Sequence, residues 1–150
     1  MSYTNVKPSS RAVVAAVLDP VSQAAATVTT GWVSMATYDA VLALLQVGAL
    51  GASATVDAKI QQATSSGGAG AKDLSPARSI TQLTKAGTDD NKQVAINVRS
   101  DELDVANSYT HVRLSVTVAT AACLISAVIL GFDARYQTAT AATTLDEVVG

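Results

Sequence analysis

The chain has few of the residues from which catalytic and metal sites are usually built. Its 150 residues include one cysteine and one histidine, and aromatic residues make up only 4%. A single cysteine excludes an internal disulfide and a cysteine-rich zinc site, and a single histidine excludes a metal site built on a histidine pair. We therefore expect no cofactor and no metal, and a protein that is not an enzyme.

Charge is also scarce, and its two signs nearly balance. Ten Lys and Arg stand against twelve Asp and Glu, which gives a formal net charge of −2. Such a chain has no long-range attraction to phosphate or anionic lipid, so we expect no nucleic-acid and no membrane partner. Soluble domains usually carry about 25% charged residues. The 15% found here, beside 49% hydrophobic residues, predicts that much of the surface contacts other protein.

Long apolar runs are missing as well. No stretch approaches the roughly 18 apolar residues of a membrane-spanning helix. The N-terminal stretch from Ala12 to Leu18 is short, is preceded by Lys7 and Pro8, and stops at Asp19. Because a signal peptide needs a longer apolar segment with small residues after it, export is not expected.

What the chain does have is an alternation of apolar and polar residues. It is clearest over residues 111–118 and recurs over 93–99 and 55–61. A period of two predicts strands with one buried face. Residues 41–47 and 124–132 are apolar at nearly every position, which predicts strands with both faces covered. A helix is the alternative for 41–47, because its Ala and Leu residues favour one.

Turn residues separate these segments about every ten residues, as in sandwiches and barrels. Clusters of Gly, Ser, Asn and Asp mark turns at 48–53, 65–70 and 86–91. Weaker strands are predicted at 26–33 and 79–83, and a single helical turn at 100–103. Seven or eight strands without long helices predict an all-β fold, an antiparallel β-sandwich of which the jelly roll is the eight-stranded form.

The two ends differ from this body in composition. Residues 21–136 form the predicted sandwich domain, whereas 1–20 and 137–150 are rich in small residues with little pattern. We interpret them as an N-terminal and a C-terminal arm. Extended arms of this composition can add a strand to the exposed sheet edge of a neighbour.

The remaining candidates for chemistry have simpler explanations. His111 lies on the polar face of a predicted strand, as surface and interface histidines do. The acidic groups at 89–91 and 101–104 lack the ligand spacing of an EF-hand loop, and the glycines of 66–70 lack the order of a phosphate-binding loop. Cys123 stands among apolar residues, which predicts packing in the core.

Six strand and turn segments carry a resemblance that spans about residues 28–136. They are Thr30–Asp39, Gln46–Leu50, Val56–Ala63, Ile80–Leu83, Tyr109–Val118 and Gly131–Tyr136. Together they resemble small structural virion proteins encoded among the head genes of tailed bacteriophages. The closest type is a capsid decoration or cement protein of jelly-roll form, a family without catalytic residues.

The resemblance implies a protein of the capsid surface, made in the cytoplasm of the bacterial host. Such proteins bind the major capsid protein, as dimers or trimers, and hold the shell against the pressure of packed DNA. On this hypothesis we assign adhesion to the two arms and to the exposed face around His111 and Arg113, so deleting residues 1–18 is expected to leave the sandwich folded. The predicted interface residues are Lys7, Arg11, Val13, Val14, Val17, Tyr109, His111, Arg113, Tyr136, Leu145 and Val148.

Other functions stay open at this point. A head–tail junction or tail subunit would also be a small β-rich virion protein, and the number of copies per particle would distinguish it. A carbohydrate-binding β-sandwich module would normally present aromatic residues on one sheet face, and the clear predicted strands carry none.

Overall fold

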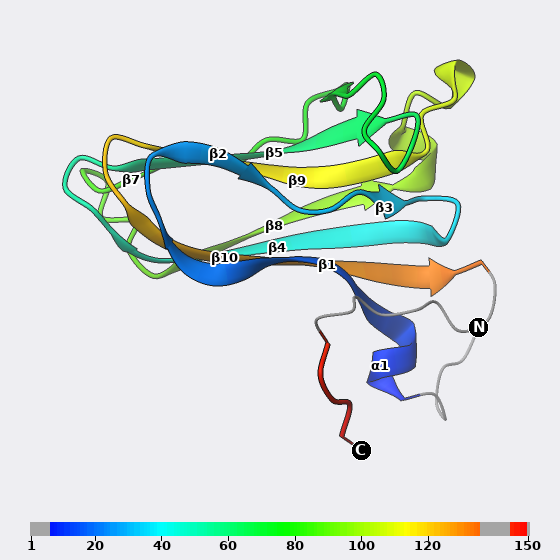
Figure 1. The fold of residues 1–150 in the computed structure, drawn as a ribbon, viewed down its shortest axis with the longest axis horizontal. Helices are drawn as coiled ribbons and strands as arrows, with labels where there is room; N and C mark the ends of the chain where they lie inside the picture. The colour runs from blue at the N-terminus through cyan, green and yellow to red at the C-terminus, as the bar shows by residue number, and fades with distance from the viewer. Residues whose placement is uncertain (1–6, 136–144, 150) are drawn as a thin grey trace.

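A computed structural model describes residues 7–135 and 145–149, which form two antiparallel β-sheets packed face to face (Figure 1). Sheet A has the strand order β1 (Ala12–Gln23), β10 (Cys123–Ala134), β4 (Tyr38–Leu50) and β8 (Lys92–Arg99). Sheet B has the order β2 (Ala26–Thr29), β9 (His111–Ala119), β5 (Thr55–Ala63) and β6 (Lys72–Asp73). Two short strands extend sheet B, namely β3 (Val33–Ser34) beside β9 and β7 (Leu83–Thr84) beside β5.

The pairing is nested, so that strands from the first half of the chain pair in reverse order with strands from the second half. β1 pairs with β10, β2 with β9, β4 with β8 and β5 with β6, all antiparallel. A long hairpin paired in this way and rolled up until its strands fall into two sheets is a jelly roll. The all-β sandwich predicted from the alternation is therefore confirmed.

The core lies between the two sheets. On β4, Val41, Ala43 and Leu45 point inward and are at most 2% exposed, and on β9 Leu114 and Val116 are at most 1% exposed. Because side chains alternate between the two faces of a strand, every second residue enters this layer. The strands predicted at 93–99, 55–61 and 111–118 owe their positions to this alternation, and all three are confirmed.

The N-terminal arm expected over residues 1–20 is wrong from residue 12 onward. A short helix, α1 (Pro8–Arg11), leads into β1, which pairs with β10 along its length. Val13 and Ala16 of β1 face the core, each 8% exposed. Two register shifts interrupt the pairing of β1, and they break the alternation by which a strand is recognised in a sequence.

Other differences are smaller. Residues 41–47 lie within β4, so the helical alternative is wrong there. The strand expected at 26–33 is divided into β2 and β3, and the one expected at 79–83 is reduced to a single bridge at Ser79 and the start of β7. The predicted helical turn is the 3₁₀ helix η1 (Ser100–Glu102), which a second one, η2 (Val105–Asn107), follows.

Only part of the expected C-terminal arm belongs to the described residues. Residues 145–149 have no regular secondary structure, and 137–144 and 150 lie outside the described part. Within the described ranges, no helix has the length and apolar character needed to cross a membrane.

Candidate functional site

The outer face of sheet A, which points away from sheet B, is apolar across its centre. Because paired strands are in register, the outward side chains of its four strands line up in rows. One row contains Val14, Leu130, Leu42 and Asn97. The next row contains Val17, Val128, Leu44 and Ala95. We call these eight residues the central rows; none of them is charged, and all are partly or fully exposed.

The rows on either side remain nearly free of charge. Beyond the first central row lie Ala12, Phe132, Ala40 and Arg99. Arg99 stands at the corner of the sheet, with its Nε 3.3 Å from a carboxylate oxygen of Asp101. Beyond the second lie Ser126, Gln46 and Gln93, which are polar and uncharged. Opposite Ser126, the irregular part of β1 between Leu18 and Val21 holds the exposed Asp19.

A shallow hollow of about 480 Å³ lies at the polar end of this face. Val21 of β1 and Leu124 of β10 line it and are 49% and 48% exposed. Gly48 belongs to the same lining, and a β-carbon there would stand 3.0 Å from the Cβ of Leu124. Leu124 thus adds an exposed apolar side chain beyond the polar row, beside Ser22 of β1.

This face corrects one expectation from the sequence. Residues 41–47 and 124–132 are apolar on both sides of the strand, yet only their inward side chains are covered by sheet B. Single exposed apolar residues are common on protein surfaces, whereas contiguous apolar patches mark sites of interaction. The sequence signal for two covered faces therefore comes from an apolar outer face, which is a candidate binding surface.

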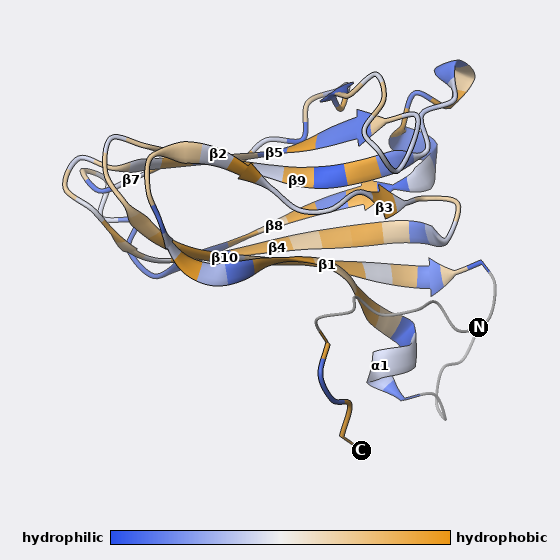
Figure 2. Cartoon of the chain, in the orientation of Figure 1, coloured by the Kyte–Doolittle hydropathy of each residue, from blue (hydrophilic) through white to orange (hydrophobic). Residues whose placement is uncertain are grey.

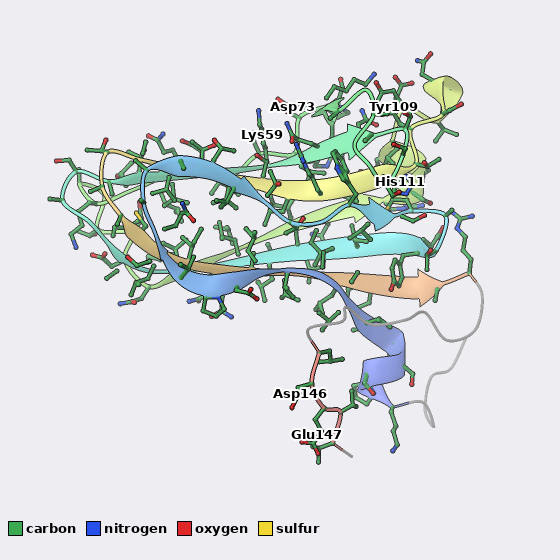
Figure 3. All side chains as sticks on the ribbon, in the orientation of Figure 1. Lys59, Asp73, Tyr109, His111, Asp146 and Glu147 are labelled. Carbon is green, nitrogen blue, oxygen red and sulfur yellow. The ribbon has the colours of Figure 1, made fainter. Side chains whose placement is uncertain are left out.

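The outer face of sheet B has the opposite character (Figure 2). On β5 the ammonium of Lys59 lies 2.8 Å from a carboxylate oxygen of Asp73, and both side chains are visible on this side of the molecule (Figure 3). Thr27 and Thr117 share a hydrogen bond of 2.8 Å between their hydroxyls. These polar groups find partners within the chain, so this face needs no protein partner to satisfy them.

Arg113, one of the predicted interface residues, is held against sheet B. Its Nε and Nη2 both donate to Oε1 of Gln61, at 3.0 and 2.8 Å. Its guanidinium carbon stands 4.4 Å from the centre of the Trp32 ring, within cation–π range. The side chain therefore joins β9, β5 and the segment between β2 and β3.

Tyr109 and His111 are also engaged within the chain, at one end of sheet B (Figure 3). The hydroxyl of Tyr109 donates to the carbonyl of Gly70 at 2.8 Å, and the ammonium of Lys72 lies 4.2 Å from its ring centre. Nδ1 of His111 is 2.9 Å from the hydroxyl of Thr110. Burial lowers the pKa of His111, which favours the neutral imidazole. Tyr109 thus anchors the 65–70 loop, and the His111 ring is hydrogen-bonded to its neighbour Thr110.

The other predicted residues fall in different places. Val14 and Val17 lie in the central rows, whereas Val13 faces the core. Leu145 and Val148 are 38% and 58% exposed on the C-terminal segment.

Three predicted residues lie near the ends of the chain. Lys7 and Arg11 are exposed at the two ends of α1. Tyr136 lies outside the described residues.

Sequence reasoning did not single out Leu42, Leu44, Val128 and Leu130, the residues at the middle of the central rows. A signal for them was present. In an antiparallel sandwich each sheet has one inner face, so a strand that is apolar at every position must place half of its apolar residues outside.

A metal site needs several ligating side chains close together. Among the described residues there is no group of three or more His, Cys, Asp and Glu that could hold a metal ion. Cys123 is 1% exposed and faces the core, as its apolar neighbours predict. Fold and geometry together define a jelly-roll sandwich whose candidate site is a largely apolar sheet face.

Comparison with known proteins gives no relative to set beside this description. No protein-family model, no curated protein and no solved structure matches the chain.

Proposed function

We propose that this protein is a non-enzymatic structural subunit that works by binding other protein surfaces, and that it is a decoration or cement protein of a phage head. The observation that carries the proposal is the outer face of sheet A. Its central rows place Leu42, Leu44, Val128 and Leu130 at the surface with no charged residue among them. When a partner covers such exposed apolar surface, the complex is stabilised by about 25 cal/mol for each Å² buried.

The more specific assignment rests on the resemblance of the six segments between residues 28 and 136. The jelly-roll strand order agrees with the form expected for such proteins. A low content of charged residues suits a subunit that lies against neighbours. Many copies bound to one lattice gain from multivalency, so modest contacts for each copy are enough.

In this proposal the partner is the major capsid protein, and the chain ends contribute to attachment. Lys7 and Arg11 on α1 and Leu145 and Val148 near the C-terminus are exposed. α1 and the C-terminal segment 145–149 lie on the side of sheet A that faces away from sheet B (Figure 1).

Quantitative mass spectrometry of purified particles from a host that produces this protein tests the proposal. We expect hundreds of copies per particle, a number in simple ratio to the major capsid protein, and we expect particles lacking the protein to release their DNA at lower temperature. A count in the tens would instead identify a head–tail junction or tail subunit. Absence of the chain from purified particles would contradict the virion assignment altogether.

A further inference from the structure

We infer that the outer face of sheet A binds the same face of a second copy of this chain, so that two molecules pack face to face about a two-fold axis. The inference rests on the proposed function in one respect, because it takes this face to be a binding surface. It adds the occupant and the residues at the centre of the contact.

The charge distribution favours a second copy. At a two-fold interface each residue meets the same surface patch of its partner, so charges near the axis meet like charges. The central rows contain no charged residue, and Asn97 is their one polar side chain. The outer face of sheet B, with Asp57, Lys59 and Arg113, lacks this property.

Face-to-face packing of two sheets already occurs within the molecule. Its own two sheets pack by interdigitating apolar side chains, at about 10 Å from sheet to sheet. Leu42, Leu44, Val128 and Leu130 form outward the same kind of ridged apolar surface that Val41, Ala43 and Leu45 form inward. A flat sheet face of this kind fits another sheet face.

The whole outer face of sheet A, including the part beside α1, is close in area to one side of a standard interface. Sheet A has strands of 8 to 13 residues. With about 4.8 Å between strands and about 3.4 Å per residue, the face measures about 19 by 38 Å, or about 700 Å² in projection. Side-chain relief makes the accessible area larger than the projected one, and a standard interface buries about 800 Å² on each partner.

Association through the edges of sheet A is the less favourable mode. The edge strand β1 contains Pro20, which has no N–H to donate, and two register shifts twist it away from regular pairing. The other edge strand, β8, is bordered by residues 77–83, which line a hollow of about 560 Å³ together with it. The faces, in contrast, need no backbone pairing.

α1 and the C-terminal segment lie on the same outer side of sheet A as the proposed contact (Figure 1). α1 precedes Ala12, which pairs with Phe132 in the row beside the central rows, and α1 contacts β1 and β10 there. In the view of Figure 3, Asp146 and Glu147 of the C-terminal segment are drawn on the same side of sheet A as α1. The proposed contact is therefore centred on the central rows, beside the row that α1 precedes.

Sedimentation velocity of the full-length protein over a range of concentrations tests the inference. We expect the unmodified protein to sediment as a dimer. The variant Leu44→Lys places one ammonium in each copy at the middle of the contact, and we expect it to raise the dissociation constant at least about 100-fold. Thr117→Lys is the matched control, because it adds the same charge to the outward side of β9 in sheet B. We expect it to leave the dimer unchanged.

If Leu44→Lys does not fold, Leu44→Gln serves as a second variant. It adds no charge, and its side chain is compatible with an outward strand position. Weakened dimers in Leu44 variants beside an intact Thr117→Lys dimer support the inference. The inference is overturned if the unmodified protein is a monomer or a trimer. It is also overturned if Thr117→Lys dissociates the dimer and the Leu44 variants do not. Particle incorporation is scored separately, so a monomer that still assembles onto heads removes the inference and leaves the proposed function standing.

Discussion

Gly131 lies on the inner side of β10, where the ring of Tyr38 occupies the space next to its backbone. A β-carbon built on Gly131 would overlap the Cδ1 and Cε1 atoms of that ring. Tyr38 is 5% exposed and stands at the start of β4, paired across the sheet with Ala134. Since a packed interior has no spare volume, the ring fixes the residue type at position 131.

We predict that Gly131→Ala lowers the free energy of unfolding by about 1–3 kcal/mol, the usual range for overpacking a core. Urea denaturation followed by Trp32 fluorescence measures it. Gly31→Ala is the control, because nothing lies within 4 Å of a β-carbon there and its backbone needs no left-handed conformation. Equal stability of the two variants would show that the Tyr38 ring moves aside freely.

Among the elements, η1 depends on a single carboxylate. Oε2 of Glu102 accepts the backbone N–H of Arg99 at 2.8 Å, and Oε1 accepts Nη2 of Arg78 from the segment before β7. The Arg99 N–H, with help from Arg78, lowers the pKa of Glu102, although burial acts in the other direction. One side chain thus joins the end of β8 to the segment that borders it.

We predict that Glu102→Gln lowers the free energy of unfolding at neutral pH by about 1 kcal/mol, the value of a typical hydrogen bond. A carboxyl group whose pKa is lowered by folding stabilises above its unfolded pKa and loses this contribution as pH falls through the folded one. The difference between variant and unmodified protein should therefore begin to shrink as pH falls below about 4.3, the ordinary pKa of Glu, and disappear only below the lower pKa of the folded state. Urea titrations at several pH values measure it, and a difference that stays constant into acid would contradict the role of the charge.

At the scale of the whole molecule, the structure changes what an N-terminal deletion is expected to do. Residues 12–18 pair with β10 and supply Val13 and Ala16 to the core. We predict that deleting residues 1–18 lowers the free energy of unfolding by about 3 kcal/mol or more, the cost of losing a buried Val with its neighbours. Deleting residues 1–7 leaves every described strand intact and should change it by less than about 0.5 kcal/mol. Equal urea midpoints for both deletions would show that the start of β1 adds nothing to stability.

Part of the fold could be predicted because burial and side-chain direction both alternate every two residues along a strand. Strands with one face toward solvent, such as β9 and β5, show this alternation directly. β1 does not, because its register shifts put residues out of step. The interface around Tyr109 and Arg113 was predicted from strand polarity alone, and polarity does not say that Gly70 and Gln61 already satisfy these side chains.

The sequence by itself determined the all-β class, the exclusion of an internal disulfide and of a metal site built on several histidines or cysteines, and a low content of charged residues. These follow from composition and from alternation, which are local properties of the chain. Only the tertiary structure decided which of the two apolar sides of β4 and β10 faces the core and which remains outside. The reason is physical: an isolated strand has two equivalent faces, and they become different only when a second sheet covers one of them.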